Sequence, residues 1–77
     1  MTKQEFLKQL ENVMELAPGS IKGTENLADL PKWDSLAQIS FIAMVDKHLQ
    51  QRVSGKDLLS ARTVEDLVLL AGPKVQG

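Results

Sequence analysis

The chain has 77 residues, a formal net charge of −1 at pH 7 and no cysteine. This length suits one domain, and the lack of cysteine excludes disulfides and thiolate metal sites. Its single histidine, His48, also argues against a metal site, and the balanced charge argues against nucleic acid or an anionic membrane as partner. The sequence contains no secretory signal and no apolar run of about 18 residues. We therefore expect a complete, cytoplasmic, single-domain protein spanning residues 1–77.

The first segment predicts a helix that begins after Thr2 and ends at Pro18 and Gly19. Thr2 and Glu5 have the spacing of a capping box, in which a hydroxyl and a carboxylate satisfy free backbone N–H groups reciprocally. Apolar residues then recur at helical spacing; they are Phe6, Leu7, Leu10, Val13, Met14 and Leu16.

Residues 18–34 are rich in proline and glycine and predict a long loop. Loops of this length are usually functional or disordered. Leu27 and Leu30 should pin this loop to the core, so we expect it to be ordered, with room for a helical turn.

A second helix is predicted from Asp34 or Ser35 to about Gln50, and it is apolar on two sides. The larger apolar group, the core arc, consists of Phe41, Ile42, Val45 and Leu49. The smaller group, the partner arc, consists of Leu36, Ile39 and Ala43. A helix that only roofs a core needs one apolar stripe, so we assign the partner arc to solvent or a binding partner. Burial of the helix on both sides is the alternative.

Two more capping boxes predict the remaining helices. Ser54 and Asp57 open a short helix, and Thr63 and Asp66 open a final helix that Pro73 closes. Residues 74–77 are expected to form a frayed tail, and no stretch alternates with period two over the length of a strand. The predicted fold is all-α, a four-helix bundle of three main helices and a short third helix, with a long first loop.

Ser35 stands at the predicted start of the second helix and has three possible roles. Asp34 and Ser35 are both favoured as helix caps, so capping alone is the simplest interpretation. A catalytic role fails, because His48 lies 13 residues further along the same helix, about 20 Å away at 1.5 Å per residue. A general base must lie within hydrogen-bond reach, and no Gly-x-Ser-x-Gly elbow is present. The third role is a hydroxyl that another enzyme modifies, since a helix N-terminus favours a phosphate ester.

The segment from Leu30 to Leu36, Leu-Pro-Lys-Trp-Asp-Ser-Leu, resembles the attachment segment of acyl carrier proteins. The resemblance extends over nearly the whole chain, from the first helix through the long loop to the closing helix entered by residues 61–67. In that family the serine of Asp-Ser-Leu receives 4′-phosphopantetheine from coenzyme A. The resemblance implies that Ser35, flanked by Asp34 and Leu36, carries this group through a phosphodiester. The terminal thiol would then hold acyl intermediates as thioesters and carry them between enzymes.

The same resemblance implies the partners and the surface that they contact. The partners would be a phosphopantetheinyl transferase and enzymes that load, condense or transfer the acyl group. By position, the partner arc matches the outward residues that such enzymes contact, with Ser40 and Asp46 at its edges, and the core arc matches the inward ones. The protein itself would be a monomer without catalytic activity or a metal.

The sequence departs from the family pattern on the second helix, which is usually rich in Asp and Glu. Here Asp46 is the only carboxylate of that helix after Asp34, and the Gly-Gly-x-Ser pattern of peptidyl carriers is absent. We therefore predict a stand-alone acyl carrier in a dedicated pathway, such as polyketide or specialised fatty acid synthesis. The rival interpretation is a helical protein-interaction module in which Ser35 is only a helix cap.

Overall fold

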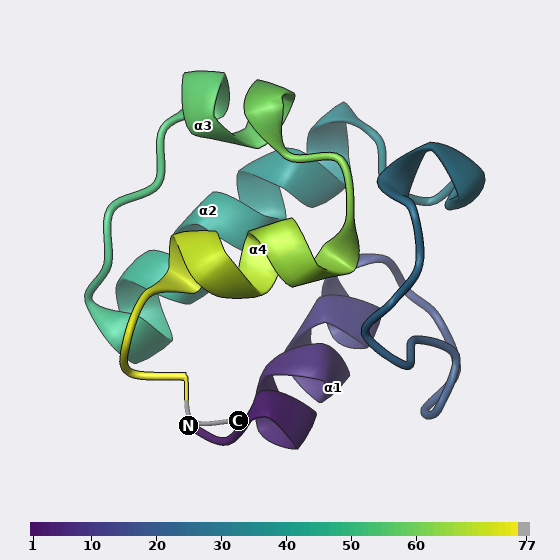
Figure 1. Ribbon diagram of the computed structural model, residues 1–77, viewed down its shortest axis with the longest axis horizontal. Helices are drawn as coiled ribbons and strands as arrows, with labels where there is room; N and C mark the ends of the chain where they lie inside the picture. The colour runs from purple at the N-terminus through teal and green to yellow at the C-terminus, as the bar shows by residue number, and fades with distance from the viewer. Residues whose placement is uncertain (76–77) are drawn as a thin grey trace.

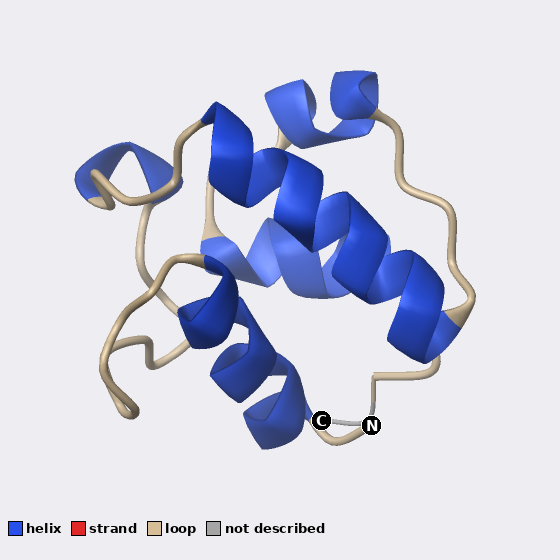
Figure 2. Cartoon of the chain, turned by 180° about the vertical axis from the view of Figure 1, so that it is seen from behind, coloured by secondary structure: helices blue, strands red, loops and turns tan. Residues whose placement is uncertain are grey.

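The computed structural model describes residues 1–75, which form a helical bundle with a long loop after the first helix (Figure 1). The elements are α1 (Lys3–Val13), the 3₁₀ turn η1 (Leu27–Asp29), α2 (Ser35–Leu49), α3 (Gly55–Ser60) and α4 (Val64–Ala71). Seen from behind, these residues contain helices and loops but no strand (Figure 2). The predicted all-α fold with a short third helix is confirmed.

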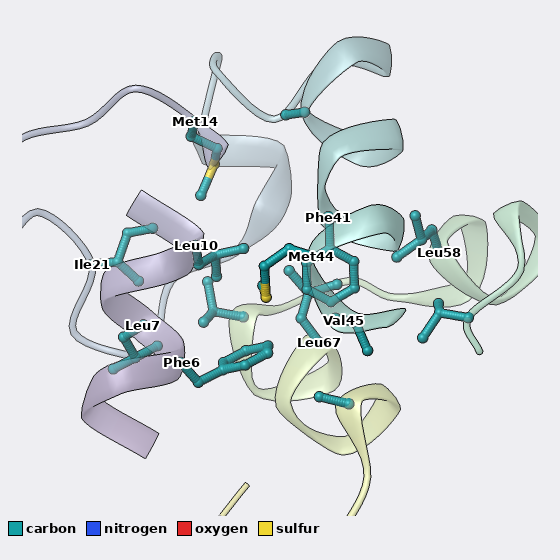
Figure 3. Close-up of a cluster of buried hydrophobic side chains, with 14 of the residues drawn as sticks. Phe6, Leu7, Leu10, Met14, Ile21, Phe41, Met44, Val45, Leu58 and Leu67 are labelled. Atoms are coloured by element: carbon teal, nitrogen blue, oxygen red, sulfur yellow. The ribbon is translucent and has the colours of Figure 1, made fainter. Parts of the chain in front are cut away.

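The core lies where α1, α2 and α4 meet, and aromatic rings occupy its centre (Figure 3). Phe6 of α1 packs edge-on against Phe41 of α2, with ring centroids 6.0 Å apart. Leu10, Val45 and Leu67 are buried around these rings. Each helix turns one apolar stripe toward this centre, as helical periodicity predicts.

The helix starts agree with the three predicted capping boxes. At Thr2, Ser54 and Thr63 the hydroxyl accepts the N–H of the residue three positions later, and the carboxylate of that residue accepts the N–H of the cap. Each box satisfies two backbone donors that the helix itself leaves free. These starts could be read from the sequence because each depends on only four consecutive residues.

The predicted end of the first helix was wrong, because α1 stops at Val13, well before Pro18. Glu15 has a left-handed φ of 57°. Its N–H donates to the carbonyl of Asn12 at 3.1 Å, and the N–H of Leu16 donates to the carbonyl of Glu11 at 2.8 Å. This pair of bonds is a Schellman motif, which satisfies the last carbonyls of the helix and turns the chain away.

The long loop is ordered, as predicted, and backbone hydrogen bonds join it to α1 and to the start of α4. The buried Glu11 carboxylate accepts the N–H of Ile21 at 2.9 Å. Near η1, the N–H of Leu27 donates to the carbonyl of Arg62 at 2.9 Å, and the N–H of Val64 donates to the carbonyl of Glu25 at 3.0 Å. These bonds fix the segment that leads into α2.

The expectation of a frayed tail was wrong for residues 74 and 75. Val75 packs against the core, and the N-terminal amine of Met1 donates to the carbonyl of Lys74 at 3.2 Å. Residues 76 and 77 lie outside the described part of the chain. The last helix ends at Ala71, before Gly72, whose φ is 89°, so the stop comes slightly before the predicted Pro73.

Acid should destabilise the fold through carboxylates that accept hydrogen bonds from backbone N–H groups. The backbone N–H groups of Arg62 and Thr63 lower the pKa of Asp66. Burial raises the pKa of Glu25, but the N–H groups of Lys22 and Gly23 outweigh this effect and lower it. A lowered folded-state pKa contributes stability above the unfolded pKa, and this contribution is lost as the pH falls through the folded value.

We therefore expect the melting temperature to be flat near neutral pH and to fall below about pH 4, the usual range of unfolded carboxylates. Asp66→Asn should lower the melting temperature at pH 7 and reduce its dependence on acid. The matched control is Asp46→Asn near the other end of a helix, where no capping bond is removed. Equal pH profiles for the wild type and Asp66→Asn would contradict this account.

Candidate functional site

The start of α2 is capped by Asp34 and not by Ser35. Asp34 has an extended backbone conformation, and its carboxylate accepts the N–H of Ala37 at 2.9 Å. Its carbonyl accepts the N–H of Gln38, also at 2.9 Å. Ser35 is the first helical residue and is exposed. The interpretation of Ser35 as the helix cap is therefore wrong, since its neighbour already fills that role.

Trp33 fixes the loop that presents this helix start. Its indole ring lies edge-on to Phe41, with ring centroids 5.7 Å apart, and its backbone N–H donates to the carbonyl of Leu30 at 3.0 Å. The side chain is half-buried. Trp33 therefore anchors the loop against α2. Ser35 lies two residues beyond this anchor, so its position is tied to the core.

The surroundings of Ser35 suit a covalently attached phosphate. The first turn of a helix presents backbone N–H groups and the positive end of the macrodipole, which stabilise an anion there. The hydroxyl is exposed, and the side-chain cap is supplied by Asp34. His48 lies in the last turn of the same helix and is exposed. Among residues 1–75 no group of three metal-ligating side chains is found.

The two apolar arcs of α2 are separated as predicted. In the partner arc, Leu36 is 72% exposed, Ile39 is 65% exposed and Ala43 is exposed, whereas Phe41 and Val45 of the core arc are fully buried. Burial of α2 on both sides was the wrong alternative. At the edges of the partner arc, Ser40 is half-buried and Asp46 is exposed.

The buried side of α2 is wider than the sequence indicated. Ala37 and Met44 are buried beside the core arc, while Ile42 is only half-buried. The sequence did not predict that Ala37 is buried, because a small apolar residue can lie on either the buried or the exposed side of a helix.

A groove of about 560 Å³ lies between α1 and α2. Its walls include Gln9, Asn12 and Val13 of α1 and Leu36, Ser40 and Ala43 of α2. Sequence reasoning did not find this groove, because it depends on how two helices pack. It also did not indicate that Leu59 of α3 and Leu69 of α4 are exposed.

The comparison with protein families agrees with this geometry. The family described as phosphopantetheine attachment site matches residues 4–70. The chain belongs to this family. Members of the family carry covalently attached 4′-phosphopantetheine and serve as non-catalytic carriers. No curated protein and no solved structure gives a significant match to the chain.

Membership of the family thus indicates the phosphopantetheine carrier role. The structure adds that Ser35 is exposed at the start of α2, where a phosphate ester can be accommodated. Across residues 1–75, none of the helices is long and apolar enough to cross a bilayer.

Proposed function

We propose that this chain is a stand-alone acyl carrier protein whose 4′-phosphopantetheine is attached to Oγ of Ser35. The observation that carries the proposal is the exposed Ser35 hydroxyl at the first position of α2, next to a cap supplied by Asp34. If a serine hydroxyl capped the helix, its modification would break the capping hydrogen bond. In this chain the Asp34 carboxylate makes that bond, so modification of Ser35 leaves the cap in place. The surface around it can therefore receive a transferase without loss of the fold.

The chain contributes position and an anion-stabilising environment to the attachment. A phosphopantetheinyl transferase would join Ser35 Oγ to the pantetheine-bearing phosphorus of coenzyme A and accept the hydroxyl proton. The pyrophosphate P–O bond would break, and adenosine 3′,5′-bisphosphate would leave. Asp34 holds the first turn of α2 in place through the N–H of Ala37. The positive end of the helix dipole and the backbone N–H groups of that turn would stabilise the negative charge of a phosphodiester on Ser35. When bound, the group supplies a thiol that holds an acyl chain as a thioester.

Delivery to partner enzymes would depend on the partner arc. Leu36 and Ile39 are large apolar side chains in water on the same helix as Ser35. Their desolvation would contribute about 25 cal/mol per Å² of apolar surface buried. The partners we propose are the transferase and enzymes that load, condense or transfer the acyl group, with the carrier acting as a cytoplasmic monomer.

A dedicated pathway, such as polyketide or specialised fatty acid synthesis, is supported by the weak charge of α2. Between Ser35 and Gln50 the Asp and Lys side chains are limited to Asp46 and Lys47. A surface of this kind does not suit partners that recognise a strongly acidic helix.

Intact-protein mass spectrometry tests the proposed function most directly. The chain should gain the mass of one phosphopantetheine group after incubation with coenzyme A and a promiscuous transferase. A chain that stays unmodified with several transferases would overturn the carrier assignment in favour of the interaction module.

Binding of the loaded carrier to its own downstream enzyme should weaken only slightly between low and moderate salt. Salt screens exposed charges over about 8 Å at physiological ionic strength, but it hardly weakens the desolvation of an apolar surface. A titration at several salt concentrations measures this effect, with a strongly acidic family member and its own partner as the control. A steep loss of affinity for this chain would show that charges elsewhere, such as Asp34, Glu65 and Asp66, steer the encounter.

A further inference from the structure

The segment that leads from the long loop into α2 turns every third side chain toward the core. Leu27 is buried, Leu30 and Trp33 are half-buried and packed against the core, and the residues between them are exposed. Side chains three positions apart lie above one another in a 3₁₀ turn, and η1 begins this arrangement. The segment therefore lies on the bundle along one apolar edge, the brace, which consists of Leu27, Leu30 and Trp33.

Backbone hydrogen bonds at the same spacing join the three residues of the brace. The N–H of Leu30 donates to the carbonyl of Leu27 at 3.0 Å, and the N–H of Trp33 donates to the carbonyl of Leu30 at 3.0 Å. The next residue, Asp34, caps α2. Successive turns thus connect Leu27 to the first turn of α2, which holds Ser35.

Both ends of the brace are attached to other parts of the bundle. At the first end, the N–H of Leu27 donates to the carbonyl of Arg62 at 2.9 Å, directly before the capping box of α4. At the second end, the indole of Trp33 lies edge-on to Phe41 of α2. The side chain of Leu30 is the contact with the core between these two attachments.

Loosening the brace at its middle would displace Ser35, because the cap of α2 directly follows Trp33. Local openings of a fold begin where few buried contacts hold a segment, and Leu30 is only half-buried. Attachment requires the phosphorus of coenzyme A and Ser35 Oγ to meet at reacting distance and in the right orientation. A serine that spends less time in position therefore reacts less readily.

We propose that Leu30 is a positioning residue for phosphopantetheine attachment, and that through the brace it holds Ser35 in the orientation that the transferase binds. The inference rests on the proposed carrier function with attachment at Ser35. Leu30 acts through Trp33 and Asp34 and does not touch the transferred group.

The kinetic test compares Leu30→Ala with Leu16→Ala, because both leucines are half-buried and packed against the core. Initial rates of mass gain are measured over a range of carrier concentrations, with coenzyme A and a promiscuous transferase, well below the melting temperature of each variant. Leu30→Ala should raise the KM for the carrier about threefold and keep kcat, since the transferase binds only the positioned fraction of the molecules. Leu16→Ala should keep the wild-type KM, and the volume-conserving Leu30→Met should restore it.

Amide hydrogen exchange of the unmodified chain, without transferase, reports on the brace itself. In Leu30→Ala, exchange at the N–H groups of Trp33 and Ala37 should accelerate about tenfold more than exchange at Val45 in the middle of α2, as expected for a local opening. Leu16→Ala should show no such excess at Trp33 and Ala37. If Leu30→Ala does not fold, as judged by circular dichroism, Leu30→Val should give the same pattern with smaller changes.

Three results would overturn the positioning role. These are a wild-type KM for folded Leu30→Ala or Leu30→Val, an equal rise in KM for Leu30→Ala and Leu16→Ala, and exchange at Trp33 and Ala37 that accelerates no more than at Val45. Each of them can occur while the wild type still gains one phosphopantetheine group, so the carrier function would stand. A wild type that gains no mass would instead overturn the carrier function, and the positioning role with it.

Discussion

Val45→Asp should remove a large part of the stability of the fold and lower its melting temperature strongly, whereas Ile39→Asp should leave the melting temperature nearly unchanged. Val45 is fully buried on α2, so the substitution forces a carboxylate with no partner into the core. Unpaired buried charges are among the few changes that cost more than about 4 kcal/mol. A domain of 77 residues has a total stability of about 4–12 kcal/mol at 0.05–0.15 kcal/mol per residue.

Ile39→Asp is the matched control, because it introduces the same carboxylate on the same helix. Ile39 is 65% exposed, so its replacement leaves the new charge in water. Thermal denaturation followed by circular dichroism measures both variants. Ile39→Asp should instead impair modification or acyl transfer, since it places a charge in the partner arc. If both variants unfold alike, the partner arc is not a free surface.

The helix starts and the two sides of α2 could be predicted because they depend on short-range signals. A capping box needs four residues, and helical periodicity needs about two turns. The start of α2 was predicted to within one residue, at Asp34 or Ser35, and its end at about Gln50, and the structure has Ser35–Leu49. Gln50 has a left-handed φ of 54°, which ends the helix.

The end of α1 could not be predicted from the same signals. Pro18 and Gly19 are strong helix breakers, but the chain leaves the helix earlier through a left-handed Glu15. Glutamate carries no marked preference for that conformation. The turn is held by contacts that appear only in the fold, such as the bond from the Ile21 N–H to the Glu11 carboxylate.

The role of Ser35 was ambiguous for a related reason. Aspartate and serine are both good N-caps, so two adjacent candidates leave the position of the cap open by one residue. Only the backbone geometry distinguishes them, with Asp34 extended and Ser35 helical. The α1–α2 groove could not be predicted either, because nothing in the sequence shows that Gln9 and Ala43 line the same groove in the folded chain.

Ser35→Ala should abolish phosphopantetheine attachment completely and leave the fold intact. Alanine is a good helix former, and the cap remains in place through the Asp34 carboxylate. The melting temperature should therefore stay close to that of the wild type, while the intact mass shows no added group after incubation with coenzyme A and the transferase. Ser40→Ala, on the same helix and half-buried, is the control and should gain one group as the wild type does.

Asp34→Ala tests whether the helix cap that positions Ser35 affects attachment while the Ser35 hydroxyl itself is kept. Loss of the cap should lower stability by about 1 kcal/mol, and the frayed first turn should slow attachment without preventing it, because the Ser35 hydroxyl is still present. The initial rate of mass gain measures this effect, with the melting temperature recorded on the same samples.

Attachment to Ser35→Ala would show that another hydroxyl carries the group, and the assignment of the site to the start of α2 would then be wrong. A Ser35→Ala chain that unfolds would instead place the cap at Ser35, against the bond from the Ala37 N–H to the Asp34 carboxylate.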